Sequence, residues 1–92
     1  DESLKENIKP IENVLDKIKD YRCVEYNLKA EKTDKKIGFI AQDWEQDFDA
    51  IVDKDADGIL SMKYTETIPV LLKAIQELSA KLEALECQCE KK

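Results

Sequence analysis

The last third of the chain carries a heptad repeat of apolar residues, and this repeat constrains the fold more than any other feature. Apolar side chains alternate three and four residues apart, which predicts one long amphipathic helix of coiled-coil character. The alternative is a helix that packs only on its own head domain, but a head this small cannot cover the whole stripe. Self-association is therefore predicted through Ile68, Leu71, Ile75, Leu78, Leu82, Leu85 and Cys89.

The heptad positions also bear on the number and choice of partners. With Ile75 at position a, Lys81 falls at g and Glu86 at the following e, a pairing that can set partner choice between helices. Isoleucine at a with leucine at d favours a dimer on these residues alone. Leu72 and Ala74 widen the stripe, so that one side of the helix can also pack on the head.

Length and composition restrict the class of protein further. Ninety-two residues with 42% hydrophobic content predict one small domain with a thin core. A net charge of -6 and a single arginine, Arg22, argue against nucleic acid as a partner. No apolar run approaches the roughly 20 residues of a membrane span, so no membrane partner is expected.

The residues available for chemistry are few. The absence of histidine excludes Ser-His and Cys-His nucleophile pairs and the commonest zinc sites. Cys23, Cys87 and Cys89 are odd in number and are interpreted as reduced thiols in a cytoplasmic setting. We expect no metal and no cofactor.

Periodicity predicts a small mixed head before the long helix. We expect a helix over 10–19, a strand over 21–28, a charged loop over 29–36, a buried strand over 37–41 and a short helix over 42–48. A hairpin should follow. The fold class is therefore α+β, with a head over residues 1–64 and an oligomerising helix over residues 65–92. Thr65 is the expected N-cap of that helix, and Pro69 should be tolerated near its first turn.

The segment Asp53-Lys54-Asp55-Ala56-Asp57-Gly58 allows two interpretations. It matches the first half of a calcium-binding loop, but the twelfth position, which should be a bidentate glutamate, is Tyr64. The flanking segments 50–52 and 59–62 are apolar, and Asp-Gly between two such segments predicts a hairpin. We interpret the segment as a structural hairpin.

Two short motifs do not follow from periodicity. One is Leu4-Lys5-Glu6-Asn7-Ile8 and the other is Gly38-Phe39-Ile40-Ala41-Gln42-Asp43. The small Gly38 and Ala41 indicate close backbone approach or tight packing. Gln42 is the polar residue expected to face inward, where it could orient the strand or a cleavage loop.

Together these motifs resemble the C-terminal intramolecular chaperone and auto-processing domain of phage tail spikes and tail fibres, the peptidase S74 family. That family opens with Ser-Asp-x-x-Leu-Lys-x-Asn-Ile and carries Gly-aliphatic-Ile-Ala-Gln-acidic at its centre. Its serine would fall immediately before Asp1. Tyr64-Thr65 to Ile68-Pro69 extends the resemblance, which continues to about Leu85.

The resemblance implies one peptide cleavage in cis by a Ser-Lys dyad. Lys5 matches the general base, and Asn7 and Gln42 would support it. A lysine acts as a base only when burial or a nearby cation lowers its pKa. Ser3 occupies a variable position and is not assigned as the nucleophile. A chain beginning at Asp1 should therefore be inactive by itself.

The resemblance also implies partners and a location. The domain would form a homotrimer, assist folding of the upstream spike or fibre of the same polypeptide, and then be released. It would act in the cytoplasm of the infected bacterium and be absent from the mature virion. The alternatives are a coiled-coil oligomerisation module without proteolysis, and the equivalent domain of a membrane-bound transcription factor.

Overall fold

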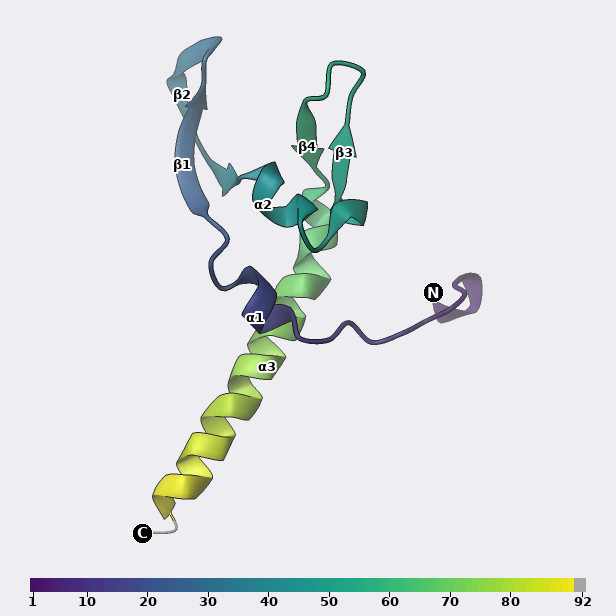
Figure 1. The fold of residues 1–92 in the computed structure, drawn as a ribbon, viewed down its shortest axis with the longest axis vertical. Coiled ribbons are helices and arrows are strands. Elements are labelled where there is room, and N and C mark those ends of the chain that lie inside the picture. The colour runs from purple at the N-terminus through teal and green to yellow at the C-terminus, as the bar shows by residue number, and fades with distance from the viewer. Residues whose placement is uncertain (91–92) are drawn as a thin grey trace.

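The computed structural model describes residues 1–90, with side chains described as far as Cys87. It has the predicted α+β class, with two small antiparallel hairpins, short helical segments and one long C-terminal helix (Figure 1). In chain order, with η for a 3-10 helix, the elements are η1 (Glu2–Leu4), α1 (Val14–Ile18), β1 (Cys23–Leu28), β2 (Glu31–Phe39), α2 (Ala41–Glu45), η2 (Asp49–Ile51), β3 (Val52–Lys54), β4 (Leu60–Met62) and α3 (Tyr64–Glu90).

The molecule is elongated. Its radius of gyration is 17.4 Å, whereas a compact domain of this length has a radius of about 12 Å. In Figure 1 the two hairpins project from one end, the C-terminal half of α3 projects from the other, and the N-terminal segment leaves to one side. Only the middle of the molecule therefore packs a core.

The core is as thin as the chain length predicts. Its buried apolar side chains are Val14, Trp44, Ile51, Val70 and Ala74. Trp44 is the largest of them and is 1% exposed. The rings of Tyr21, Phe39 and Phe48 surround it, with centroids 5.3, 5.1 and 5.8 Å from that of Trp44.

The first hairpin corrects the prediction of a charged loop over 29–36. Residues from Glu31 onward form β2, which pairs with β1 in an antiparallel register that places Leu28 opposite Glu31 and Tyr26 opposite Lys36. Lys29 and Ala30 are left to make the turn. A hairpin that projects from the core has water on both faces, so its strands can be charged without the alternation that marks a half-buried strand.

The prediction of a buried strand over 37–41 is wrong about burial. β2 ends at Phe39, and the Ile37 side chain is 81% exposed. Because only the root of the hairpin reaches the core, Phe39 contacts Trp44 while Ile37, two residues farther out, has no cover.

The hairpin predicted around Asp-Gly is confirmed. Val52, Asp53 and Lys54 pair with Met62, Ser61 and Leu60. One Asp55 side-chain oxygen accepts hydrogen bonds from the backbone N–H groups of Asp57, at 2.9 Å, and Ile59, at 3.0 Å. Gly58 adopts a φ of 80°, which an L side chain rarely tolerates. These contacts support the structural interpretation of the acidic loop.

The short helices differ from prediction mainly in their bounds. α1 begins at Val14, because Asn13 has a left-handed backbone conformation with φ 55° and the chain from Pro10 to Glu12 is not helical. α2 ends at Glu45, and the 3-10 helix η2 follows it. Asparagine tolerates the left-handed region better than most residues, so it can end an extended segment here.

The long helix α3 begins at Tyr64, so Thr65 is not its N-cap. The Thr67 hydroxyl instead donates to the Tyr64 carbonyl at 2.6 Å. Pro69 lies within the helix, in its second turn. Thr67, Val70 and Ala74 are buried against the head. Among the helices of the described chain, none is long and apolar enough to cross a membrane.

A neighbouring face of α3 is uncovered. We call the predicted residues Ile68, Leu71, Ile75, Leu78, Leu82 and Leu85 the α3 stripe. All but Leu71 are exposed, Ile75 by 63%, and Leu71 packs partly against the core. The side chain of Cys89, which extends the repeat, lies outside the described residues, whereas Cys23 and Cys87 are free and exposed.

Gly38 is predicted to be required by the root of the first hairpin. A Cβ at this position would lie 2.5 Å from the Tyr64 hydroxyl and 3.3 Å from Tyr26 Cε1. The same hydroxyl accepts a hydrogen bond from the Phe39 N–H at 3.1 Å. Gly38→Ala should therefore lower the free energy of unfolding by about 1–3 kcal/mol, measured by urea denaturation.

The control is the same substitution in a Tyr64→Phe background. Without the hydroxyl the closest clash is gone, so Gly38→Ala should cost less there. An equal cost in both backgrounds would show that the Tyr64 hydroxyl does not set the requirement for glycine.

Candidate functional site

Lys5, the predicted general base, lies on an extended segment that the rest of the chain does not cover. We call residues 1–12 the N-terminal arm; every one of them is exposed. η1 forms a single turn closed by the hydrogen bond from the Lys5 N–H to the Glu2 carbonyl at 3.0 Å. Lys5 follows this turn in an extended conformation, with φ -112° and ψ 149°. The single chain therefore does not provide the burial that a lysine base needs.

The arm is apolar as well as charged. Leu4 is 86% exposed and Ile8 is 60% exposed. Asn7 lies between them with φ 54°, a left-handed conformation that turns the chain within the motif. Leucine and isoleucine side chains fully in water leave about 1.5–3 kcal/mol each of burial free energy unused. The arm therefore exposes apolar side chains that would gain free energy if another surface covered them.

Gln42 does not face inward, contrary to expectation. Its side chain is exposed on α2, where it lines a groove of about 420 Å³ between the two hairpins. The N-terminal arm leaves the molecule on the side of α3 away from the first hairpin and α2 (Figure 1). Lys5 and Gln42 are therefore not brought together within one chain.

Asp43, the acidic end of the second motif, has a defined structural role. Its carboxylate accepts three hydrogen bonds from Arg22, all at 3.0 Å, from the backbone N–H, Nε and a terminal guanidinium nitrogen. These bonds, first those from the side chain and then that from the backbone, lower the pKa of Asp43. The pair fixes the segment before β1 to the start of α2.

A second polar contact joins the segment before β1 to the residues that follow α2. The Tyr21 hydroxyl donates to the Asp47 carboxylate. Burial, and then this hydrogen bond, raise the pKa of the Tyr21 hydroxyl, so it remains a donor. The ring of Tyr21 packs edge-on against Trp44, so the polar pair closes the core at this edge.

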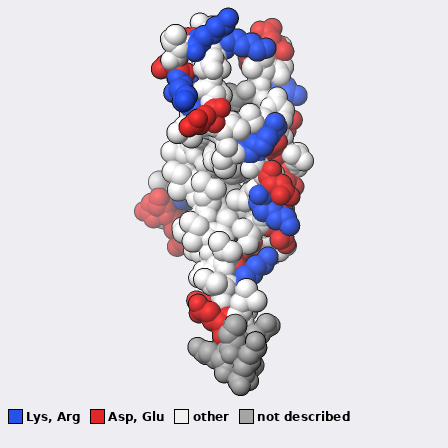
Figure 2. All heavy atoms as spheres, turned by 90° about the vertical axis from the view of Figure 1, so that its left-hand side faces the viewer, with Lys and Arg blue, Asp and Glu red and all other residues white. Residues whose placement is uncertain are grey.

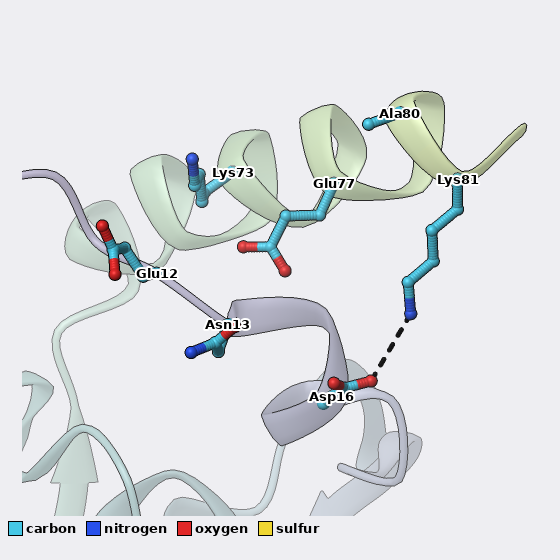
Figure 3. Close-up of a pocket in the computed structure, with 7 residues that line it drawn as sticks. All are labelled: Glu12, Asn13, Asp16, Lys73, Glu77, Ala80 and Lys81. Atoms are coloured by element: carbon cyan, nitrogen blue, oxygen red, sulfur yellow. Dashed lines mark ion pairs between the residues drawn. The ribbon is translucent and has the colours of Figure 1, made fainter. Parts of the chain in front are cut away.

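The root of the arm is held by α3. Glu77 extends from α3 toward the start of α1, and its two carboxylate oxygens accept the backbone N–H groups of Val14, at 3.0 Å, and Leu15, at 2.9 Å (Figure 3). Lys81, one turn along, forms an ion pair with Asp16 at 3.6 Å. These residues border an open pocket of about 440 Å³ together with Glu12, Asn13, Lys73 and Ala80.

Sequence reasoning missed Glu77 and the pairing of Arg22 with Asp43. Arg22 is the only arginine in the chain and Asp43 ends a recognised motif, which are weak signals for a pair. Glu77 gives no local signal, because its partners lie 62 and 63 residues away. The candidate site is thus an exposed arm bearing Lys5 whose root is attached to the long helix.

Loss of Arg22 should produce a pH-dependent defect. Because the folded pKa of Asp43 lies below its ordinary 3.8, the interaction stabilises the fold above pH 3.8 and is lost as the pH falls through the depressed pKa. Arg22→Gln should be less stable than wild type at neutral pH, and the difference should shrink below pH 3.8. Urea denaturation across this range measures it.

The control for this prediction is Lys36→Gln, which removes an exposed ion pair with Asp34 of 3.6 Å. Such pairs contribute little, so this variant should follow wild type at every pH. A difference between Arg22→Gln and wild type that stays constant with pH would contradict the assignment to Asp43.

Comparison with known proteins identifies the family. A family model of Peptidase S74, described as chaperone of endosialidase, matches residues 1–53. The matched range includes both short motifs, while the resemblance noted from Tyr64 onward lies outside it. No curated protein and no solved structure matches the chain. Because the match covers more than half of the 92 residues, the chain belongs to the Peptidase S74 family, described as chaperone of endosialidase.

Proposed function

We propose that the chain is an intramolecular chaperone that trimerises an upstream phage tail spike or fibre during folding and is released by Ser-Lys autoproteolysis. The observation that carries the proposal is the uncovered α3 stripe, in a chain that belongs to a chaperone family. Leucine and isoleucine side chains that repeat along a helix are unfavourable in water. Burial against another helix would remove this cost.

The exposed area of the chain supports association. A folded monomer of 10.6 kDa exposes about 5,500 Å². This chain exposes 7866 Å², roughly 2,400 Å² more. That excess is on the scale that stable interfaces bury. Figure 2 shows a broad uncharged area in the middle of one face, with charged side chains at the hairpin end and along the edges.

A trimer is proposed from the family resemblance, since the heptad residues alone favour a dimer. In a trimer, three heads and three arms surround one bundle of α3 helices. The exposed Leu4 and Ile8 would then find cover on neighbouring chains, and the same cover would bury Lys5. Assembly would thus precede the chemistry.

The proposed reaction needs a serine immediately before Asp1 in the parent polypeptide. Neutral Lys5 Nζ would accept the serine Oγ proton as Oγ attacks the adjacent peptide carbonyl. The proton would pass to the leaving amine, and water would hydrolyse the resulting ester. The chaperone would act in the cytoplasm of the infected bacterium and be absent from the mature virion, because cleavage separates it from the folded product.

Cleavage is tested by the intact mass of the parent polypeptide. Wild type should yield a large product and a fragment of about the size of this chain. Lys5→Ala should stay whole, because no base remains to deprotonate the serine. Lys9→Ala is the matched control, since Lys9 is also an exposed lysine of the arm, and it should split like wild type. A Lys5→Ala variant that splits normally would exclude Lys5 as the base.

Association through the α3 stripe is tested by Leu78→Lys. A lysine at this d position would place an unpaired charge in the bundle, which should weaken association by at least about tenfold. Gln76→Lys adds the same charge outside the stripe and should leave the oligomer intact. Sedimentation equilibrium measures both. A Leu78→Lys chain that associates like the control would show that the stripe is not the interface.

A further inference from the structure

We propose that Glu77 is a positioning residue for the cleavage step, because it attaches the arm that carries Lys5 to the helix through which chains associate. The inference rests on the function proposed above. It adds a residue, outside both short motifs, whose contacts connect oligomer formation with the geometry of the cleavage site.

Glu77 takes the place of a local helix cap on α1. The first N–H groups of a helix have no partner within the helix. Asn13 precedes α1 and makes no side-chain cap hydrogen bond. Both Glu77 oxygens are used instead, one for the Val14 N–H and one for the Leu15 N–H. The beginning of α1 is therefore defined by a side chain of α3.

This contact lies at the point where the arm leaves the head. All residues of the arm are exposed, and Val14 is the first buried residue of the chain. Asn13 adopts its left-handed conformation immediately before the contact and so turns the chain there. Lys5 lies only nine positions before Val14, so a change in direction at this point would displace it.

On the other side, Glu77 belongs to the associating helix. It lies between Ile75 and Leu78, two residues of the α3 stripe. A rotation or shift of α3 on assembly would therefore move the root of the arm with it. Loss of this contact would leave the direction of the arm relative to the bundle less well defined.

The charges around Glu77 are mixed, and the carboxylate stays ionised among them. The hydrogen bonds from Leu15 and Val14 lower the pKa of Glu77, Lys73 on α3 adds to this effect, and Asp16 on α1 opposes it. Glu12 and Lys81 also border the pocket (Figure 3). An ionised carboxylate offers two acceptor oxygens, whereas an amide offers one and places a donor against the second N–H.

The test is Glu77→Gln in the full parent polypeptide, followed by the rate of cleavage, the oligomeric state and amide hydrogen exchange at Val14 and Leu15. We expect faster exchange at these two amides, an unchanged oligomer, and cleavage slowed roughly ten- to hundredfold, as for a misplaced catalytic group. Glu77→Asp keeps two acceptor oxygens and should recover part of the rate. Asp16→Asn removes the exposed ion pair with Lys81 at the same helix contact without changing α3, and it should cleave like wild type.

Each other outcome overturns the inference in an identifiable way. Glu77→Gln that cleaves at the wild-type rate excludes a positioning role, and so does slow cleavage accompanied by loss of the oligomer. A wild type that does not cleave, or a Lys5→Ala variant that does, removes the proposed reaction itself. Hydrogen exchange separates these cases, because protection of Val14 and Leu15 depends on the contact and not on cleavage.

Discussion

Trp44 lies where the separate parts of the head meet, and the rest of the structure depends on its burial. Its ring contacts Tyr21 ahead of β1, Phe39 at the end of β2, and Phe48 beyond α2. The same core includes Val14 of α1 and Val70 of α3. Substituting a buried tryptophan by alanine costs about 3–5 kcal/mol, a large share of the stability of a domain this size.

A core of five buried apolar side chains leaves many large apolar side chains of the described residues exposed. Many of these side chains lie on two elements that leave the core, the N-terminal arm and the α3 stripe, and others, such as Ile37, lie on the hairpins. In a single molecule this exposure is unfavourable, and in the proposed oligomer neighbouring chains would cover it. Membership in a chaperone family and the distribution of burial are therefore both consistent with the proposed association.

Part of this arrangement follows from the sequence. The heptad predicts α3 because a period of three and four identifies a helix face, and Asp57-Gly58 predicts the second hairpin because few residues fit its turn. The strand from Glu31 was missed because a hairpin in water needs no apolar alternation. Lys5 is a candidate base only through the family motif, and the contacts of Glu77 are visible only in the fold, since its partners are distant in sequence.

The charged first hairpin has a consequence for the solubility of the single chain. A two-stranded sheet leaves unpaired backbone groups on both edges, and such edges recruit strands from other molecules. From Glu31 to Lys36 the strand β2 carries lysines and carboxylates, which oppose this kind of stacking. With a net charge of -6, unassembled chains also repel one another at long range. Both effects oppose amyloid-like aggregation of free single chains.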